Sequence, residues 1–294
     1  MRYDSPARPR APRATILAAS VRVVFAILAA HLAPLLVPIE GLADVIETGF
    51  LNRNVTIDDR GYRYQVFVPA SYDPARSWPV ILFLHGSGER GGDGLRQTQA
   101  GLGNAIRFDP ERFPFLVVFP QAPADSVWLG APARAAIAAL DTTLAEYNAD
   151  RDRVILTGLS MGGYGAWHLA WQSPERFAAI VAICGGVVPS PTSKVVRRAP
   201  ETIGASDPYA FVARRVAAVP AWIFHGADDP VVPVTESREL VRALRDAGAD
   251  PRYTEYAGVG HGSWEPAYAD TALWRWVSEQ RRAAPRAPAS SGPR

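Results

Sequence analysis

The sequence predicts an α/β fold, a single domain in which helices cover both faces of a mainly parallel, doubly wound β-sheet. Two observations lead to this class. Short continuous apolar runs, such as residues 79–84, are typical of strands that are covered on both faces. Segments with helical periodicity, such as residues 161–172, alternate with these runs, and this alternation indicates βαβ units. A length of 294 residues suits one large α/β domain.

The predicted elements follow one another from residue 62 onward. An alternating, half-exposed strand at residues 62–69 comes first, and residues 252–256 have the composition of an edge strand. The other predicted strands are 79–84, 115–119, 154–156, 178–183 and 221–224. The predicted helices are 131–147, 161–172, 235–247 and 268–281.

Two stretches interrupt this alternation. Residues 86–103 are rich in glycine and charge, so we expect a loop over the edge of the sheet. Residues 185–205 contain Pro189, Pro191 and Pro200, which favours a surface insertion near the functional site.

The two ends of the chain differ in composition from its centre. Residues 1–43 have an arginine-bearing start, an apolar run at 23–30 and small residues before Asp44, which is typical of a signal peptide. We therefore expect a catalytic domain at residues 44–283, exported to the periplasm or the medium, without stable membrane insertion after cleavage. An uncleaved membrane anchor is the alternative. Residues 284–294 have the composition of a disordered tail, and the oligomeric state stays open.

Charge argues against a nucleic-acid partner, and cysteine content rules out an intrachain disulfide. Of the 31 basic and 29 acidic residues, five and two fall in residues 1–43, which leaves 26 and 27 in the remainder. A nearly neutral domain has no electrostatic attraction for nucleic acid, so we expect no such partner. The single cysteine, Cys184, allows no intrachain disulfide, and its apolar surroundings favour a buried thiol over a reactive one.

The motif that carries the chemistry is Gly158-Leu-Ser160-Met-Gly162, which lies where a predicted buried strand meets a predicted helix. At such a junction the motif is typical of a nucleophile elbow, in which a strained backbone exposes the serine hydroxyl. The glycines avoid clashes with the neighbouring strand and helix. The sequence therefore predicts Ser160 as a nucleophile, with an inert serine in a glycine-rich turn as the alternative.

A serine nucleophile needs a base, and elimination among the five histidines leaves His261. His31 lies in the leader, and His168 lies more than two turns along the helix of Ser160, where a core or surface role is expected. His85 and His225 each end a strand before a glycine, which suits structural roles. His261 lies in a glycine-flanked loop and follows the acidic candidates, as the order Ser, Asp, His requires.

The acid that orients the base is predicted in the segment after residue 224. Asp229 precedes Pro230, which biases it toward an extended conformation and fixes its direction. Asp228 is the alternative acid, although it could cap the loop through local hydrogen bonds. The sequence favours Asp229.

The oxyanion of an acyl-transfer reaction needs two backbone N–H donors. The amide of Met161, directly after the nucleophile, is the first candidate. The second is the amide of Ser87 in the glycine-rich turn after residues 79–84, with Gly86 as the fallback.

These motifs together resemble those of secreted bacterial esterases related to carbohydrate esterase family 1 and the phospholipase-like carboxylesterases, and those of the peptidase branch near prolyl oligopeptidase catalytic domains. All of these have the α/β-hydrolase fold. The resemblance covers about residues 62–277. It rests on residues 84–91, 120–123 with Trp128, 158–165, 183–186, 225–233 and 258–264.

The resemblance implies hydrolysis of a small carboxylic ester through an acyl-enzyme, without a cofactor. Trp128, by resemblance, and Trp264, three residues from the base, are expected to line the substrate pocket, with ordinary packing as the alternative. No metal is expected, because His225, Asp228 and Asp229 lie too close along one loop to surround an ion.

Two other functions stay open. A serine peptidase would use the same triad, but the β-propeller of prolyl oligopeptidases has no room in this chain, which favours esters. A non-catalytic, membrane-tethered protein could also keep this fold.

Overall fold

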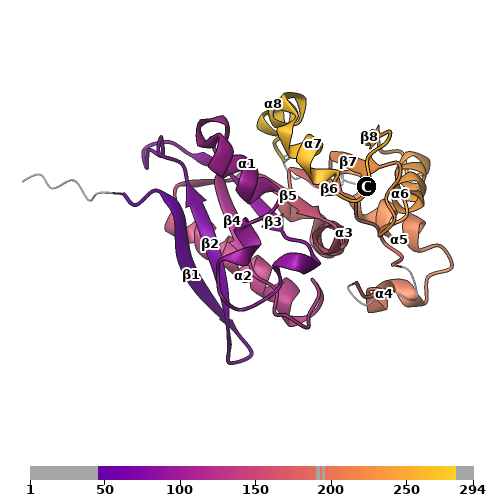
Figure 1. Cartoon of the computed structure of the whole chain (residues 1–294), viewed down its shortest axis with the longest axis horizontal. Coiled ribbons are helices and arrows are strands. Elements are labelled where there is room, and N and C mark those ends of the chain that lie inside the picture. The colour runs from indigo at the N-terminus through magenta and orange to yellow at the C-terminus, as the bar shows by residue number, and fades with distance from the viewer. Residues whose placement is uncertain (1–45, 190–192, 194–195, 283–294) are drawn as a thin grey trace, which may run out of the picture. The chain divides into compact units, whose positions relative to one another are not determined.

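A computed structural model of the chain describes residues 46–189, 193 and 196–282. An eight-stranded sheet, in the order β1-β2-β4-β3-β5-β6-β7-β8, forms its centre (Figure 1). β2 is antiparallel to both of its neighbours, and all the remaining pairs are parallel. The predicted signal peptide at 1–43 and the predicted tail at 284–294 lie outside the described residues.

The strands are β1 Gly49–Ile57, β2 Arg60–Val68, β3 Trp78–Leu84, β4 Leu116–Pro120, β5 Ala149–Leu159, β6 Ala179–Ile183, β7 Ala221–Gly226 and β8 Arg252–Tyr256. The α-helices are α1 Leu102–Phe108, α2 Ala131–Glu146, α3 Met161–Gln172, α4 Pro200–Ile203, α5 Pro208–Val216, α6 Thr235–Asp246, α7 Trp264–Ala269 and α8 Thr271–Glu279. Short 3₁₀ turns are η1 Ser87–Glu89, η2 Arg96–Thr98, η3 Pro110–Arg112 and η4 Pro174–Arg176.

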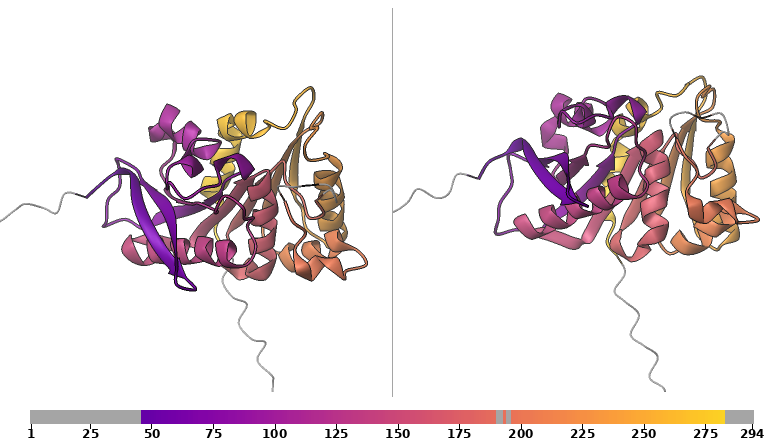
Figure 2. Two further views of the ribbon diagram at one scale, coloured as in Figure 1. Left: turned by 60° about the horizontal axis from the view of Figure 1, so that its bottom comes forward. Right: turned by 90° about the horizontal axis from the view of Figure 1, so that it is seen from below.

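The core lies in two layers, one on each face of the sheet. Successive side chains of β3 alternate between the layers, as the period of two in a strand requires: Val80 and Leu82 face one layer, and Ile81 and Phe83 face the other. Helices α2, α3, α5 and α6 cover the first layer, and α1, α7 and α8 cover the second (Figure 2). The predicted α/β-hydrolase fold, with helices on both faces, is confirmed.

The prediction of a half-exposed first strand is wrong for the second half of β2. Residues 65–68 are all buried, with Val66 in one core layer and Phe67 in the other. The cause is that core layers cover both faces of β2, which lies inside the sheet between β4 and β1. β1, which the sequence analysis missed, pairs with β2 from Gly49↔Val68 to Ile57↔Arg60. β1 carries an alternating pattern, with Leu51, Val55 and Ile57 half-buried and Asn52, Asn54 and Thr56 exposed, and only Arg53 interrupts its apolar face.

The predicted helix at 268–281 is two helices. Asp270 ends α7 and accepts a hydrogen bond from the amide of Ala272 at 2.8 Å, so it caps the N-terminus of α8. α5 was missed, although Asp207 followed by Pro208 carries a comparable start signal, and Asp207 accepts from the amide of Ala210. The stretch 86–103 is a loop with two 3₁₀ turns, as expected, except that α1 begins inside it at Leu102.

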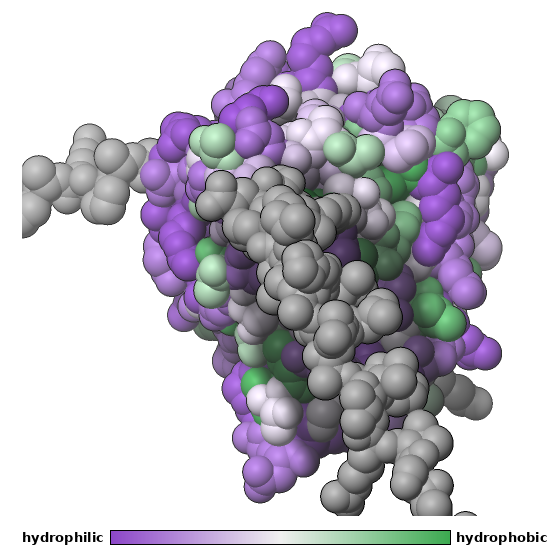
Figure 3. All heavy atoms as spheres, turned by 90° about the vertical axis from the view of Figure 1, so that its left-hand side faces the viewer, coloured by the Kyte–Doolittle hydropathy of each residue, from purple (hydrophilic) through white to green (hydrophobic). Residues whose placement is uncertain are grey.

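The visible surface on the β1 side of the sheet carries mostly hydrophilic residues, with apolar ones scattered between them (Figure 3). Single exposed apolar residues are normal on a folded protein. Within the described part of the chain, no helix combines the length and the apolar character that a membrane span needs.

Candidate active site

Ser160 lies on the sharp turn that joins β5 to α3. Its backbone adopts φ 53° and ψ −120°, a strained conformation for a residue with a side chain, and its amide donates to the carbonyl of Ile183 at 2.9 Å. A Cβ added at Gly158 would lie 2.2 Å from the carbonyl oxygen of Gly162, and one at Gly162 would lie 1.9 Å from that of Leu84. The glycines are therefore required by close backbone packing, as the sequence predicts.

The turns after β7 and β8 bring two more of the predicted residues to Ser160. His261 Nε2 lies 2.9 Å from Ser160 Oγ, and His261 Nδ1 lies 2.7 Å from Asp229 Oδ2. A carboxylate can only accept, so Nδ1 carries the proton and Nε2 is free to accept from the serine hydroxyl. The structure thus joins Ser160, His261 and Asp229 in one chain of hydrogen bonds, the geometry of a catalytic triad.

Asp229 is enclosed and fully hydrogen-bonded. Its Oδ1 accepts from the amides of Val231 and Val232 at 2.8 and 2.9 Å, while its Oδ2 faces His261. Burial alone would raise the pKa of this carboxyl, but the hydrogen bonds, led by those from His225 and His261, hold it well below its usual range. The carboxyl therefore stays ionised beside the imidazole.

The choice between the two neighbouring aspartates follows from the turn itself. Asp228 is exposed, and its amide donates to the carbonyl of Val259 at 3.0 Å. Asp229 is the residue of the pair whose side chain contacts His261.

His225 contacts the same carboxylate from the buried side, which the sequence analysis did not foresee. Its Nε2 lies 3.0 Å from the carbonyl of Val232 and 3.3 Å from Asp229 Oδ2, and its Nδ1 lies 2.7 Å from Ser237 Oγ. Because the carbonyl and the carboxylate only accept, Nε2 carries the proton and Nδ1 accepts from the serine hydroxyl. Both ring nitrogens are engaged, so His225 supports the acid and has no nitrogen left to act as a base.

The two predicted oxyanion donors are each the first residue of a helical turn. Met161 begins α3 and Ser87 begins η1, and the first amides of a helix have no acceptor within it. A Cβ added at Gly86 would lie 3.7 Å from Ser160 Cβ, so the η1 turn lies next to the nucleophile. Among the described residues neither amide donates a backbone hydrogen bond, so both stay candidates for binding a negatively charged oxygen.

A buried histidine holds the η1 turn in place. His85 Nδ1 donates to the carbonyl of Gly86 at 2.6 Å, and its Nε2 accepts from the amide of Ala122 at 3.0 Å. Burial lowers the pKa of His85 to about 4, so the ring is neutral at neutral pH. Trp128 Nε1 donates to the His85 carbonyl at 3.0 Å. The structural role predicted for His85 is the one the contacts show.

The structure places the two predicted pocket tryptophans in different hollows. Trp128 is buried and forms part of the wall of a pocket beside Met161. Trp264 packs edge-on against His261, with ring centroids 5.4 Å apart, and lines a separate groove with residues of α1. Trp128 is therefore both a packed core residue and part of a pocket wall, whereas Trp264 contacts the ring of His261.

Cys184 lies directly behind the triad. One ligand atom each from Cys184, Asp229 and His261 falls within 4.8 Å of the others, a spacing that could hold a metal ion. Two of the three already share the hydrogen bond of the triad, and burial raises the pKa of the Cys184 thiol to about 12, which keeps it protonated and a poor ligand. The cluster fits the triad better than an ion, and the expected absence of a metal stays a prediction.

Comparison with known proteins agrees with this fold. Residues 128–280, just over half of the chain, match the prolyl oligopeptidase family. Among solved structures, a thermostable esterase is similar with 34% identity and a TM-score of 0.67 over 79% of this chain. The chain spans only 63% of the length of that esterase. No curated protein matches closely enough to count as a relative.

Two more distant structures share the fold. An acylaminoacyl peptidase of Pyrococcus horikoshii is 16% identical, with a TM-score of 0.61 over 82% of this chain and 43% of its own. A ferulic acid esterase of Anaeromyces mucronatus, solved with ferulic acid, is 14% identical, with a TM-score of 0.55 over 81% of this chain and 92% of its own. At identities this low, the similarity shows a shared fold and nothing more.

Proposed function

Because the chain belongs to the prolyl oligopeptidase family, we propose that it is a serine hydrolase that cleaves carboxylic esters through an acyl-enzyme on Ser160. The observation that carries this proposal is the unbroken chain of hydrogen bonds from Ser160 Oγ through His261 to Asp229, at 2.9 and 2.7 Å.

The proposed reaction has two halves. In the first, Ser160 Oγ attacks the ester carbonyl carbon while its proton moves to His261 Nε2, and Asp229 stabilises the imidazolium. The amides of Met161 and Ser87 bind the oxyanion of the tetrahedral intermediate. The intermediate collapses, and His261 returns the proton to the departing alcohol oxygen. In the second half, a water molecule attacks the acyl-enzyme in the same way and releases the acid.

The choice of esters over peptides rests on relatedness and on the leaving group. The solved structure with 34% identity is an esterase, whereas the peptidase of Pyrococcus horikoshii has 16%. An amine leaves less readily than an alcohol, so peptide cleavage demands closer alignment of the substrate by additional contacts. A peptidase activity, which the family name makes the second candidate, would use the same three residues.

The test has two stages. Purified protein is first treated with a fluorophosphonate probe, which should label Ser160 and no other serine. The values of kcat/KM are then measured for short-chain nitrophenyl esters and for aminoacyl nitroanilides. We expect higher values for the esters. Absence of labelling would refute the hydrolase proposal, while equal or better values on the anilides would replace the esterase by a peptidase.

A further inference from the structure

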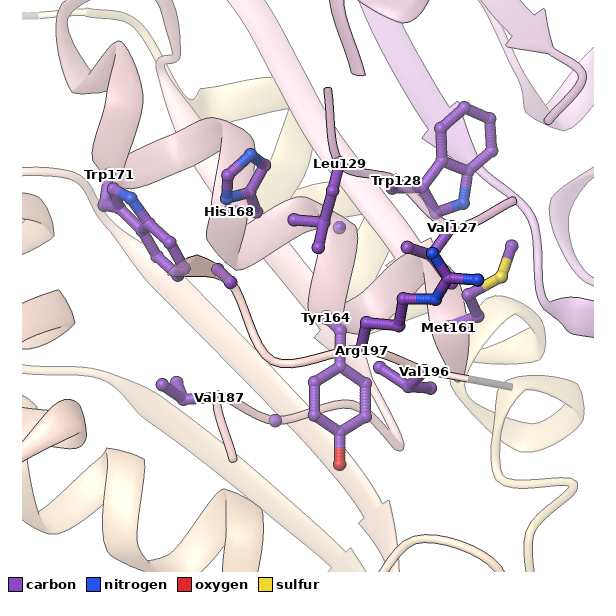
Figure 4. A pocket seen from close by; sticks show the side chains of 13 residues that line it. Val127, Trp128, Leu129, Met161, Tyr164, His168, Trp171, Val187, Val196 and Arg197 are labelled. Atoms are coloured by element: carbon purple, nitrogen blue, oxygen red, sulfur yellow. The ribbon is translucent and has the colours of Figure 1, made fainter. Parts of the chain in front are cut away.

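A narrow pocket runs along α3, and Met161, His168 and Trp171 of that helix line it (Figure 4). Among the described residues of its lining, neither Ser160 nor His261 appears. The pocket is therefore a hollow separate from the reacting atoms, and it offers a substrate no contact with the nucleophile or the base.

Two neighbouring charged residues, Glu89 and Arg90, lie in and directly after η1, the turn that begins with the predicted oxyanion donor Ser87. Within the described residues the two do not pair with each other. Arg90 Nε donates to the carbonyl of Ser87 at 2.9 Å, and Arg90 Nη1 donates to the carbonyl of Ser126 at 3.3 Å. The guanidinium is therefore used inside the protein, where it ties the η1 turn to the loop before α2.

The Glu89 carboxylate lies beside the nucleophile. A Cβ added at Gly86 would lie 3.1 Å from Glu89 Oε2 and 3.7 Å from Ser160 Cβ, so these two atoms are at most about 7 Å apart, the sum of the two distances. Glu89 is partly exposed, and its oxygens are not among the fully buried polar atoms that lack a partner. A charged group on a substrate bound at Ser160 would therefore come within reach of this carboxylate.

This carboxylate has no cation of its own. Burial raises the pKa of Glu89, the nearby amides of Gly86 and Glu89 lower it in part, and no charged side chain of the described residues contributes. A partly buried carboxylate is stabilised in its ionised form by a cation beside it. An ionised carboxylate next to an oxyanion site also opposes the negative charge that develops there. A cation on the substrate would offset both of these unfavourable interactions.

We propose that Glu89 makes the enzyme selective for charge, by forming an ion pair with an ammonium group that the substrate carries close to its ester. The inference rests on the proposed function, because it takes Ser160 as the nucleophile and the Ser87 amide as an oxyanion donor. The same ion pair is available to an ammonium in the acyl part and to one in the alcohol part. Coulomb attraction over about 7 Å corresponds to about threefold in kcat/KM in water and to more in a partly buried site, and salt weakens it.

The proposal is tested with two pairs of esters that differ in charge, at neutral pH and low salt. In the acyl arm, the ethyl esters of β-alanine and butyric acid place an ammonium or a methyl group at the same position. In the alcohol arm, acetylcholine is compared with its tert-butyl analogue, in which carbon replaces nitrogen. We expect the ammonium ester to be favoured in at least one arm, and the ratio of kcat/KM to fall as salt is added. A ratio that does not respond to salt in either arm would overturn the proposal without recourse to any variant.

Variants then assign the preference to the residue. Glu89→Gln keeps the shape and an acceptor oxygen but removes the charge, so the ammonium-to-neutral ratio should fall about threefold to tenfold, whatever the rate on neutral esters. Comparison with the same ratio in the unaltered protein cancels the intrinsic reactivity of each ester. Glu175→Gln is the matched control, because Glu175 is exposed on η4, which precedes β6 and lies at the end of the sheet away from the triad. This control should leave the ratio unchanged.

Two results would contradict the inference in different ways. Equal ratios for Glu89→Gln and the unaltered protein in both arms would overturn the role of Glu89 and leave the hydrolase intact. Failure of the unaltered protein to hydrolyse every ester, with no probe labelling, would refute the proposed function and this inference with it.

Discussion

The turns that carry Ser160, Asp229 and His261, called the triad turns below, differ from the pocket beside α3 in how their polar groups are hydrogen-bonded. In the triad turns, Asp229 accepts from two amides and faces two histidines, and His225 beneath it uses both ring nitrogens. Beside the pocket, His168 is just as buried, but its Nδ1 has no partner among the described residues. The chain itself supplies every contact that orients the triad, whereas His168 Nδ1 lacks such a contact.

This difference shows that the triad is held in place by the protein's own hydrogen bonds, whereas His168 is not. Groups that stabilise a transition state gain most when they are held in place before the substrate arrives. A buried polar atom without a partner, such as His168 Nδ1, costs free energy in the folded protein and orients nothing in the triad. The predictions below test the two regions in turn, beginning with the largest effect.

The largest effect is expected at the nucleophile. Ser160→Ala should lower kcat for ester hydrolysis by about 10⁴-fold or more, because only oxyanion binding and substrate positioning remain. The fold should be retained, because alanine is small enough for the strained turn. Steady-state kinetics and probe labelling measure the loss, and activity within tenfold of the unaltered protein would rule out Ser160 as the nucleophile.

The next effect separates the two neighbouring aspartates. Asp229→Asn should lower kcat by roughly 10³- to 10⁴-fold, because an amide at this position favours the wrong tautomer of His261. Asp228→Asn, at an exposed side chain that does not contact His261, serves as the matched control and should cost far less. If the two variants showed the reverse order, Asp228 rather than Asp229 would orient the base.

A smaller effect is expected from the histidine behind the acid. His225→Phe removes a donor to Asp229 and leaves the hydroxyl of Ser237 without its acceptor. The free energy of unfolding should fall by about 1–3 kcal/mol, and kcat should fall with it because Asp229 is less firmly held. Ser237→Ala removes only the outer contact and should have the weaker effect on both. Equal kcat values for His225→Phe and the unaltered protein would mean that the amides alone position Asp229.

The smallest effect is expected in the pH dependence of stability, to which two glutamates contribute with opposite signs. Glu236 on α6 accepts from the amides of Val187 and Val188 in the pocket wall, and burial raises its pKa above 4.5. Glu255 on β8, the strand that leads to His261, has a pKa lowered to about 2 by hydrogen bonds from Arg238 and Tyr253.

The signs follow from proton binding. Above pH 4.5 the folded protein holds the Glu236 proton more tightly than the unfolded chain, so this group makes stability fall as pH rises. Glu255 contributes stability that is fully present above pH 4.5 and is lost as pH falls toward 2. The free energy of unfolding, measured with urea across pH, should therefore change in opposite ways. Glu236→Gln should remove a contribution that falls as pH rises, and Glu255→Gln should remove one that rises with pH. Difference curves of the same sign would contradict these assignments.

Much of the site could be predicted from the sequence because its signals are local. The glycines around Ser160 are required by contacts within one strand–turn–helix unit, and the predicted helix 161–172 is α3 to the residue. The core strands β3, β4, β6 and β7 carry continuous apolar runs that need no knowledge of their neighbours. β1 has no continuous apolar run, and its weaker signal, the alternation of Leu51, Val55 and Ile57 with polar residues, is interrupted by Arg53.

The sequence by itself determined the class of fold, the nucleophile elbow and the order in which serine, acid and base occur along the chain. Only the tertiary structure decided which atoms meet. His261 contacts Asp229 across 32 residues and Ser160 across 101. His225 contacts the same acid from the other side, and His168, whose Nδ1 is buried without a partner among the described residues, lies in the wall of a pocket with residues near 128 and 196. Patterns along a chain report its local geometry, whereas hydrogen bonds between distant turns depend on how the sheet brings the ends of its strands together.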